Sequence, residues 1–262
     1  MWPTPVPCWP DRPRTEIGMD ALDVLLLVFG GLFAGCVNTI AGGGSLLTVP
    51  LLIFAGLPGD VANGSNRVGI LVSNASAATA FRRMGVSGMS WVLPVLVPVM
   101  AGSLAGSLLV SRLDAESFEQ AFGLVMVPLL LLALRPPKVP AASRTWSGSL
   151  ATAVFLCVGF YGGAFQAGMG LILALALTRS GMDVVVASSV KVVVILAVTI
   201  TALPVFVGGG HVDWVPALLL AVGFACGGAV GARFTVVSGA RVVRPVMTIA
   251  VLAFSGRLLG LY

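Results

Sequence analysis

The sequence predicts an all-α protein that crosses a membrane several times. Of its 262 residues, 58% are hydrophobic and only 10% are charged, whereas about 25% of the residues in a soluble domain are charged. Several apolar runs approach the ~20 residues that a helix needs to cross the hydrocarbon core of a bilayer. The chain lacks the alternation of apolar and polar residues that a membrane β-barrel requires. This pattern excludes an ordinary soluble enzyme.

Apolar segments follow one another along the chain and divide into two groups. The first group is expected at residues 22–41, 45–57, 68–81, 91–110 and 118–134, and the second at 150–165, 168–178, 184–207, 214–232 and 242–259. The second segment of each group is too short to cross a bilayer comfortably, and each follows a glycine-rich break. Each is expected to form a broken or re-entrant hairpin with the segment before it, beside about three spanning helices per group.

A polar stretch separates the two groups. Residues 135–149 read RPPKVPAASRTWSGS, and their prolines and basic residues predict a cytoplasmic linker between a first repeat at 22–134 and a second at 150–262. The tail at 1–21 is rich in proline and lacks the order of regions that defines a signal peptide. Met19 is an alternative start, so this tail could lie upstream of the translated protein.

The two groups resemble each other weakly, at an offset of about 123 to 128 residues. Six matches occur in the same order along both halves: 31–35 with 159–163, Asn38 with Gln166, 42–44 with 168–170, 65–67 with 189–191, Trp91 with Trp214, and 102–106 with 227–231. Internal repeats of this kind are built into many transporters. The sequence therefore predicts two structural repeats.

The basic residues predict the orientation of the chain. If each hairpin returns the chain to its starting side, nine basic residues share one side: Arg82, Arg83, Arg135, Lys138, Arg144, Arg179, Arg233, Arg241 and Arg244. The other side holds four: Arg12, Arg14, Arg112 and Arg257. Cytoplasmic loops carry the excess of lysine and arginine. Both termini are therefore expected outside the inner membrane, and the two repeats are expected to be inverted relative to each other.

The first candidate site is a glycine-rich break between two apolar segments. It contains Asn38, Gly42, Gly43, Gly44 and Ser45. Lipid cannot satisfy the backbone groups that three glycines expose, so the break is expected to face protein or a polar cavity. Ser45 is expected to cap a half-helix whose positive end would attract an anion. The alternative is that the glycines only let helices pack closely.

The second candidate site is a cation with polar neighbours at the start of the third apolar segment. Ser65, Asn66 and Arg67 come directly before it. A cation within a membrane helix is costly, and by default it indicates function. The alternative is that Arg67 extends its side chain to the membrane interface.

The second half has a cation at the matching position. Ser188, Ser189 and Lys191 take the places of the first-half polar residues, and Lys191 lies about eight residues beyond Asp183 in an otherwise apolar segment. If the halves are inverted, Arg67 and Lys191 approach the middle of the membrane from opposite sides. Together they could neutralise one anionic substrate.

Other kinds of site are not indicated by the sequence. None of the ten acidic residues lies centrally in an apolar run, so neither a buried carboxylate relay nor an acidic cation filter is expected. The single histidine, His211, is expected in a loop and not at a metal. No cofactor motif, nucleophile motif or basic run is present, so we expect no cofactor, no enzyme and no binding of nucleic acid.

The order of motifs resembles that of a known family. GLFAGCVNTIAGGGSLLTVPLLIFAGLP, then NGSNR, and the weaker second copy GFYGGAFQAGMGLILALALTRSGM with SSVK, is similar to the sulfite exporter TauE/SafE family of membrane permeases. The resemblance covers nearly the whole chain, from about residue 22 to 259. The second copy departs from the pattern, because Gly170-Leu-Ile-Leu has little polar character.

The resemblance implies a secondary transporter, expected to export small sulfur-containing anions such as sulfite or organosulfonates by alternating access. The alternatives are an anion channel, a permease for small organic acids, a membrane scaffold or an intramembrane enzyme. The expected partners are the small anion and membrane lipid, and the sequence leaves a homo-oligomer open. The predicted substrate-binding residues are Asn38, Gly42, Gly43, Gly44, Ser45, Ser65, Asn66, Arg67, Gln166, Gly168, Gly170, Ser188, Ser189 and Lys191.

Overall fold

The computed structural model describes residues 21–134, 148–179 and 182–238. All the regular structure in these ranges is helical. In chain order the helices are α1 (Ala21–Ala41), α2 (Ser45–Phe54), α3 (Gly59–Arg83), α4 (Met89–Val110), α5 (Ala115–Leu134), α6 (Gly148–Ala164), α7 (Met169–Arg179), α8 (Val184–Gly208) and α9 (Trp214–Ser238). The predicted segment at 242–259, the tail and most of the linker lie outside the described residues.

The helices confirm the predicted fold class. Four of them, α1, α4, α8 and α9, are long and apolar enough to cross a membrane, judged by length and composition. Large apolar side chains remain exposed along their outer faces, for example Phe29, Val97 and Val222. A soluble protein would not expose apolar surface of this extent, so the outer faces suit contact with lipid.

Helix α3 differs from the segment that the sequence predicted. It begins at Gly59 and not at residue 68, so Asn63, Ser65, Asn66 and Arg67 are part of the helix. The sequence analysis located helices by their apolar runs, so it did not detect this polar first part of the helix. The helix keeps these side chains away from lipid, because all four are buried.

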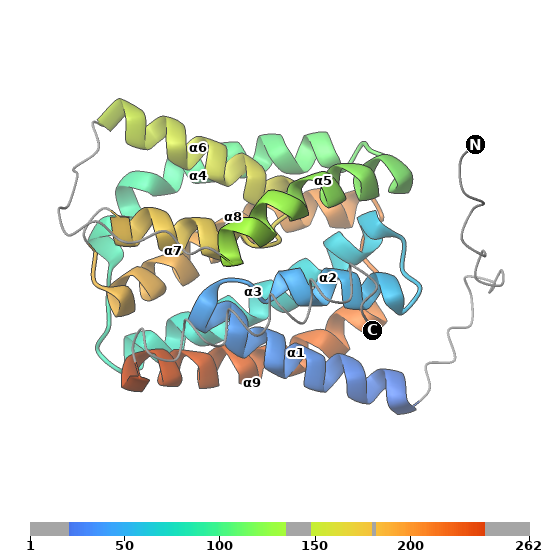
Figure 1. The fold of residues 1–262 in the computed structure, drawn as a ribbon, viewed down its shortest axis with the longest axis horizontal. Coiled ribbons are helices and arrows are strands. Elements are labelled where there is room, and N and C mark those ends of the chain that lie inside the picture. Colours follow the sequence, from blue (N-terminus) through green and yellow to red (C-terminus); the bar gives the residue numbers. More distant parts are fainter. Residues whose placement is uncertain (1–20, 135–147, 180–181, 239–262) are drawn as a thin grey trace.

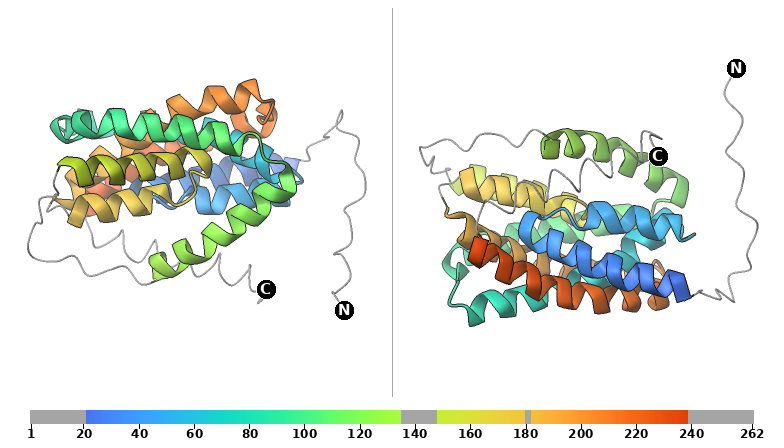
Figure 2. Two further views of the ribbon diagram at one scale, coloured as in Figure 1. Left: turned by 90° about the horizontal axis from the view of Figure 1, so that it is seen from above. Right: turned by 60° about the horizontal axis from the view of Figure 1, so that its bottom comes forward.

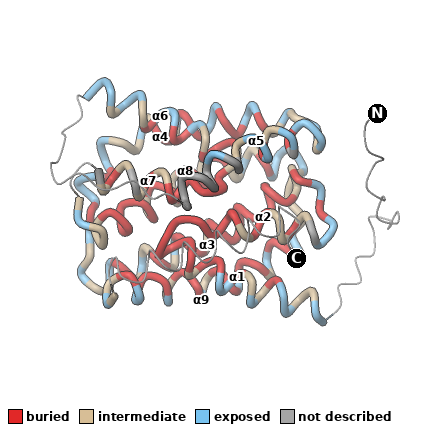
Figure 3. Tube along the Cα trace, in the orientation of Figure 1, coloured by how far each residue is buried: buried red, intermediate tan, exposed pale blue. Residues whose placement is uncertain are grey.

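The helices form three groups that lie side by side (Figures 1 and 2). Helix α1 packs along α9, and α6 packs along α4. Between these pairs, α3 packs against α9, α8 packs against α4, and α3 and α8 contact each other. The buried residues concentrate on α3, α8 and the ends of α1 and α6 (Figure 3). Helices α3 and α8 therefore form the centre of the bundle.

The bundle has two ends, which differ in the side chains they carry. Asp60 at the start of α3 contacts His211, which follows α8, and His211 also contacts Ser111 at the end of α4. We call this the His211 end. The opposite end holds Arg83 at the end of α3, and we call it the Arg83 end. Since α3 starts where α8 finishes, these two central helices are antiparallel.

Glycines let the paired helices touch through their backbones. A side chain at Gly223 of α9 would collide with the carbonyl oxygen of Val28 of α1, and one at Gly227 with that of Leu32. The same contacts join α4 to α6, where Gly102 faces the carbonyl of Leu156 and Gly106 faces that of Phe160. By these contacts Gly102 and Gly106 correspond to Gly223 and Gly227. The predicted match of 102–106 with 227–231 is therefore one helical turn out of register.

We expect Gly223→Ala to lower the thermal unfolding midpoint by about 5 °C, because the added methyl group forces α1 and α9 apart. Overpacking of this kind costs about 1–3 kcal/mol, and each 1 kcal/mol shifts the midpoint by about 2–4 °C in a chain of this size. Gly123→Ala in α5 is the matched control, since no atom of the described chain lies within 4 Å of its added methyl group. Equal unfolding temperatures for the two variants in detergent would contradict the close packing.

Candidate functional site

The two glycine-rich breaks meet in the middle of the bundle. Helix α1 ends at Ala41 and the chain turns back at Gly42, where φ is +84°. Helix α6 ends at Ala164 and the chain turns back through Gln166 and Gly168, where φ is 59° and +71°. Few residues other than glycine adopt these angles. Both hairpins therefore consist of a longer helix, a break and a shorter returning helix.

The backbones of the two breaks are in direct contact. A methyl group on Gly42 would overlap the backbone of Gly170, and a methyl group on Gly170 would overlap that of Gly42. Ser45, at the start of α2, donates a hydrogen bond to the carbonyl of Gln166 over 3.4 Å. The first-half break thus lies directly against the second-half break.

Arg67 reaches the end of α6 from the central helix α3. Its guanidinium donates to the carbonyls of Gly162, Gly163 and Ala164 at 3.2, 2.6 and 3.0 Å, and to Oε1 of Gln166 at 2.8 Å. The residue has no exposed surface. Arg67 therefore does not extend to the membrane interface.

Lys191 reaches the end of α1 from the other central helix, α8. Its ammonium donates to the carbonyls of Asn38 and Thr39 at 3.3 and 2.7 Å. It is also without exposed surface. The cation of each half therefore binds the last carbonyls of the broken helix of the other half.

This crossed arrangement follows from the electrostatics of helix ends. The last carbonyls of a helix lack partners within it and carry about half a unit of negative charge. A cation placed there satisfies the carbonyls and is itself stabilised. The helix end offsets only about half of each cation's charge, and the starts of α2 and α7 add positive ends nearby. The centre of the bundle is therefore electropositive.

Among the residues that the structure describes, neither Arg67 nor Lys191 forms an ion pair with a carboxylate, whereas His211 and Asp60 pair with each other. Buried charges in proteins are usually paired. Two buried cations without carboxylates are therefore suited to an anionic ligand.

Amide and hydroxyl groups surround the two cations. Gln166 donates to Thr199 over 2.6 Å, and Thr48 donates to Oδ1 of Asn66 over 2.5 Å. Asn63 donates to the carbonyl of Ala164 over 3.0 Å, beside Arg67. These bonds orient the side chains around the breaks and join α2, α3, α6 and α8.

Several buried donors near the breaks have no partner in the described structure. They are Nδ2 of Asn38, Oγ1 of Thr39, Nδ2 of Asn66 and Nε of Arg67. Among the acceptors, Oδ1 of Asn63 and Oδ1 of Asn74 are also without partners. An unpaired buried polar atom costs about 1–3 kcal/mol. A ligand with several acceptor oxygens would remove that cost for the donors.

Comparison with known proteins places the chain in a family. Residues 27–258 match the family described as sulfite exporter TauE/SafE, a range that includes both breaks and both cations. The chain belongs to the TauE/SafE family. That membership makes it a membrane transporter protein, and together with the four apolar helices it makes the chain a multi-pass membrane protein.

Curated relatives align with most of this chain over most of their own length. A "Probable membrane transporter protein" of Haemophilus influenzae is 29% identical over 240 residues, covering 89% of this chain and 92% of the relative. "Probable membrane transporter protein YfcA" of Escherichia coli is 30% identical over 238 residues, covering 89% and 88%. A Sinorhizobium protein, "Probable membrane transporter protein ORF9", is 28% identical and covers 92% and 94%. No solved structure matches the chain.

Ser45 does not act as predicted in this TauE/SafE chain. It is the first residue of α2, and the residue before the helix is Gly44, which provides no side-chain cap. The hydroxyl instead bonds across to Gln166 in the second half. The expected cap was wrong because the break is one residue shorter than the pattern of residues suggested.

Two predicted serines, Ser65 and Ser188, form their hydrogen bonds with residues outside the breaks. Ser65 accepts a hydrogen bond from the backbone of Asp213 over 2.8 Å, toward the His211 end. Ser188 donates to Val184 within its own helix over 2.9 Å, and it precedes the buried Ser189 by one residue. The remaining predicted residues lie on the breaks or on the neighbouring faces of α3 and α8.

The predicted set of binding residues left out several residues of the site, including Asn63, which the sequence shows beside Ser65, Asn66 and Arg67. Asn63 lies four residues before Arg67, so helical spacing could have placed both on one face. Thr48 and Thr199 each stand in an apolar helix, where a threonine gives no distinct signal. Phe206 was also missed, although its ring lies 4.2 Å from the guanidinium carbon of Arg67.

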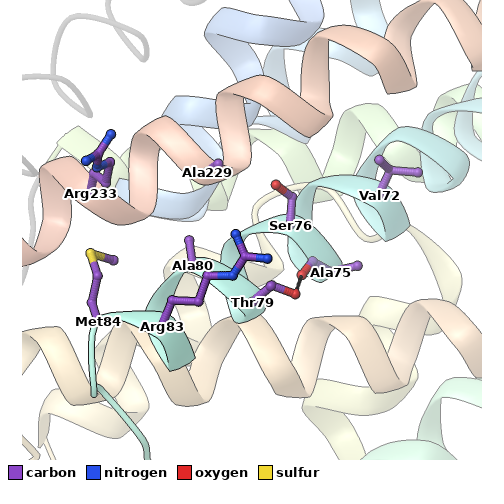
Figure 4. A pocket seen from close by; sticks show the side chains of 9 residues that line it. All are labelled: Val72, Ala75, Ser76, Thr79, Ala80, Arg83, Met84, Ala229 and Arg233. Carbon is purple, nitrogen blue, oxygen red and sulfur yellow. Dashed lines mark hydrogen bonds between the residues drawn. The ribbon is translucent and has the colours of Figure 1, made fainter.

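A surface pocket lies between α3 and α9 near the Arg83 end (Figure 4). Its volume is about 730 Å³, and its lining includes Arg83 at the end of α3 and Arg233, five residues before the end of α9. The lining residues of α3 also include Val72, Ser76 and Thr79. Because an α-helix turns by about 100° per residue, these residues lie on the face of α3 opposite Arg67. The pocket is thus separate from the buried site.

Proposed function

We infer that this TauE/SafE protein is a secondary transporter that exports small sulfur-containing anions such as sulfite or organosulfonates. One observation carries the inference: Arg67 and Lys191 are fully buried where the two helix breaks meet, and neither has a carboxylate partner in the described part of the chain. A site with excess positive charge and unpaired donors suits an anion. A proton relay or a site for a metal cation would require acidic residues there.

The chemistry of the donors favours an oxyanion. The unpartnered groups are amide, hydroxyl and guanidinium donors on α1 and α3, which suit several oxygen acceptors on one small ion. A sulfite or sulfonate group presents three oxygens around one sulfur atom. The family description names sulfite, and we extend this substrate class to organosulfonates because the donors recognise the oxygens.

Alternating access is supported by the way in which the helices are paired. Helix α1 contacts α9 as α6 contacts α4, and α3 and α8 are antiparallel. This pairing is what two inverted repeats, 22–134 and 150–262 with a linker between them, would produce. Asn38 and Gln166 are each only 2% exposed, so the site is closed to solvent in this form. Rocking one repeat against the other would open it to each side in turn.

The proposed location is the inner membrane, with the Arg83 end in the cytoplasm. Arg82 and Arg83 lie in the last turn of α3, and Arg233 lies five residues before the end of α9, which agrees with the positive-inside rule. The His211 end would then face outward. Helix α1 starts at the His211 end (Figure 1), which agrees with an N-terminus on the outer side.

Flux measurements test the proposed function. The purified protein in liposomes should carry labelled sulfite and methanesulfonate in a saturable manner, and unlabelled anion on the opposite side should drive counterflow. Flux that does not saturate and lacks counterflow would indicate an anion channel. Preference for acetate over both sulfur anions would indicate an organic-acid permease. An absence of flux for all of these anions would overturn the proposal.

Lys191→Met should raise the half-saturating concentration of sulfite about tenfold or more. A hydrogen bond from a charged group contributes about 1.5–3 kcal/mol, and the substitution also exposes the carbonyls of Asn38 and Thr39 to an apolar side chain. Arg233→Met is the matched control because it removes an exposed cation away from the breaks. The site assignment fails if Lys191→Met keeps the wild-type concentration dependence.

A further inference from the structure

His211 joins three segments at one end of the bundle. It lies between α8 and α9, and Nδ1 of its ring is 2.8 Å from Oδ2 of Asp60 at the start of α3. Nε2 is 3.0 Å from the carbonyl oxygen of Ser111 after α4. The side chains of His211 and Asp60 are 18% and 15% exposed. The pair is therefore shielded but within reach of solvent at the His211 end.

The two contacts of His211 require an extra proton. A carbonyl oxygen only accepts hydrogen bonds, and an ionised carboxylate only accepts as well. A neutral imidazole has one N–H, so with an ionised Asp60 it can satisfy only one of the two oxygens. Both contacts form when the ring carries two protons, or when Asp60 is protonated and donates to Nδ1. In either case the pair holds one proton more than neutral histidine and ionised aspartate.

Loss of that proton weakens the contact between segments. It leaves a lone pair of the imidazole facing an oxygen at about 3 Å, where an attractive bond had been. The other carboxylate oxygen, Oδ1 of Asp60, is buried without a partner in the described structure. Asp60 therefore has no second hydrogen bond that would hold it in place once the proton is lost. The closed arrangement at this end is therefore the form that binds the proton.

The same segment covers the buried site from the His211 end. Asp60, Gly64 and Arg67 are spaced by four and three residues, so they share one face of α3. The carbonyl of His211 packs directly on Gly64, where a side chain would collide with it. Phe206 lies between His211 and Arg67: its ring is 6.3 Å from the His211 ring and 4.2 Å from the guanidinium carbon of Arg67. The connection and Phe206 together close the route to Arg67.

Other charged groups near this end are engaged elsewhere or exposed. The Asp213 carboxylate accepts from the backbone of Val215 over 3.2 Å, at the start of α9. A hydrogen bond from Ser117 lowers the pKa of Asp114, which precedes α5. Arg112 is exposed in the turn after α4. Among the described residues, Asp60 is thus the carboxylate that pairs with His211.

We propose that His211 and Asp60 form a proton-binding site that holds the His211 end shut, so that release of the proton opens the route to Arg67. The direction of the effect follows from the count of protons. The closed form holds one more proton than the open form, so acidic medium at this end favours closure and alkaline medium favours opening. The effect on transport rests on the proposed function, whereas the opening of the segment does not.

Hydrogen exchange of the backbone amides tests the opening without any substrate. The amide of Asp213 donates to Ser65 on α3, and the amide of His211 donates to Phe206 over 2.9 Å. After correction for the intrinsic pH dependence of exchange, protection of these amides should fall about tenfold between pH 5.5 and pH 8.0 in the wild type. His211→Gln should remove this dependence, because glutamine does not titrate. Asp60→Asn should weaken it.

Asp213→Asn is the matched control for these variants. It removes a carboxylate from the same segment but retains an oxygen that can cap α9, so it should keep the wild-type dependence on pH. If amide protection in His211→Gln depends on pH in the same way as in the wild type, the proposal is overturned. A loss of protection at acidic pH would also overturn it, because that has the opposite sign.

Flux of methanesulfonate extends the test to transport, because this anion does not titrate in the range used. Acidification of the medium at the His211 end should reduce wild-type flux, and His211→Gln should be insensitive to it. If no anion is transported under any condition, the proposed function fails while the exchange experiment still decides on the proton site. If flux occurs but has the same pH profile in both proteins, the proton site does not control transport.

Discussion

Arg67→Ala is expected to reduce transport of sulfite or methanesulfonate by about 100-fold and to lower stability by several kcal/mol. The guanidinium satisfies the carbonyls of Gly162, Gly163 and Ala164 together with Gln166. Its loss leaves the carbonyls of Gly162 and Gly163 and Oε1 of Gln166 without this donor, at about 1–3 kcal/mol for each, whereas the carbonyl of Ala164 keeps its bond from Asn63. It also removes half of the buried positive charge that we assign to substrate binding. Initial rates in liposomes and unfolding in detergent measure the two effects.

Two further variants separate binding from folding. Arg67→Lys keeps the charge, but a single ammonium cannot reproduce the planar fork that spans several acceptors, so it should be folded and yet transport poorly. Arg82→Ala removes an exposed arginine from the same helix and should behave as the wild type. Normal transport by folded Arg67→Ala would show that the anion does not need this cation.

Gly42→Ala is expected to prevent the two hairpins from meeting. Its backbone has φ of +84°, which costs about 1–3 kcal/mol for a residue with a side chain, and its methyl group would overlap the backbone of Gly170. Because backbone atoms of a neighbouring helix cannot move as a flexible side chain does, we expect little folded protein. Size-exclusion chromatography and the unfolding temperature give the measure.

Neighbouring glycines provide the controls for this prediction. Gly43→Ala places a methyl group 3.6 Å from Leu46 and 3.9 Å from Leu171, which is ordinary contact, so it should be tolerated. Gly170→Ala has the overlap with Gly42 without a positive φ. If it is as harmful as Gly42→Ala, the contact between breaks is the cause. Equal behaviour of Gly42→Ala and Gly43→Ala would contradict the observed crossing.

The fold class could be predicted because lipid imposes a simple requirement on sequence. Long apolar runs are needed to cross hydrocarbon, and they marked most of the helices to within a few residues. Helix α3 was the exception, since its first half is polar and its partners are α8 and α9 instead of lipid. A helix that is buried among other helices need not be apolar along its whole length, so apolar runs do not mark its ends.

The two cations were visible in the sequence, whereas their partners were not. Arg67 and Lys191 stood out because a charge in an apolar segment is costly. Their acceptors are backbone carbonyls 95 to 97 residues away for Arg67 and 152 or 153 residues away for Lys191. Every residue has a carbonyl, so composition cannot reveal which ones a cation will bind. Only the crossing of the helices decides this.

The crossed bonds of the cations have a consequence for the order in which the chain can mature. The last carbonyls of α1 are made early, but Lys191, which satisfies them, is made about 150 residues later. The carbonyl of Asn38 also accepts from the nearby amide of Gly42, but until Lys191 is made the carbonyl of Thr39 lacks its donor in a region that excludes water, which is unfavourable. The first hairpin therefore reaches its final position only once α8 has been synthesised and inserted, so maturation of the first half depends on completion of the second.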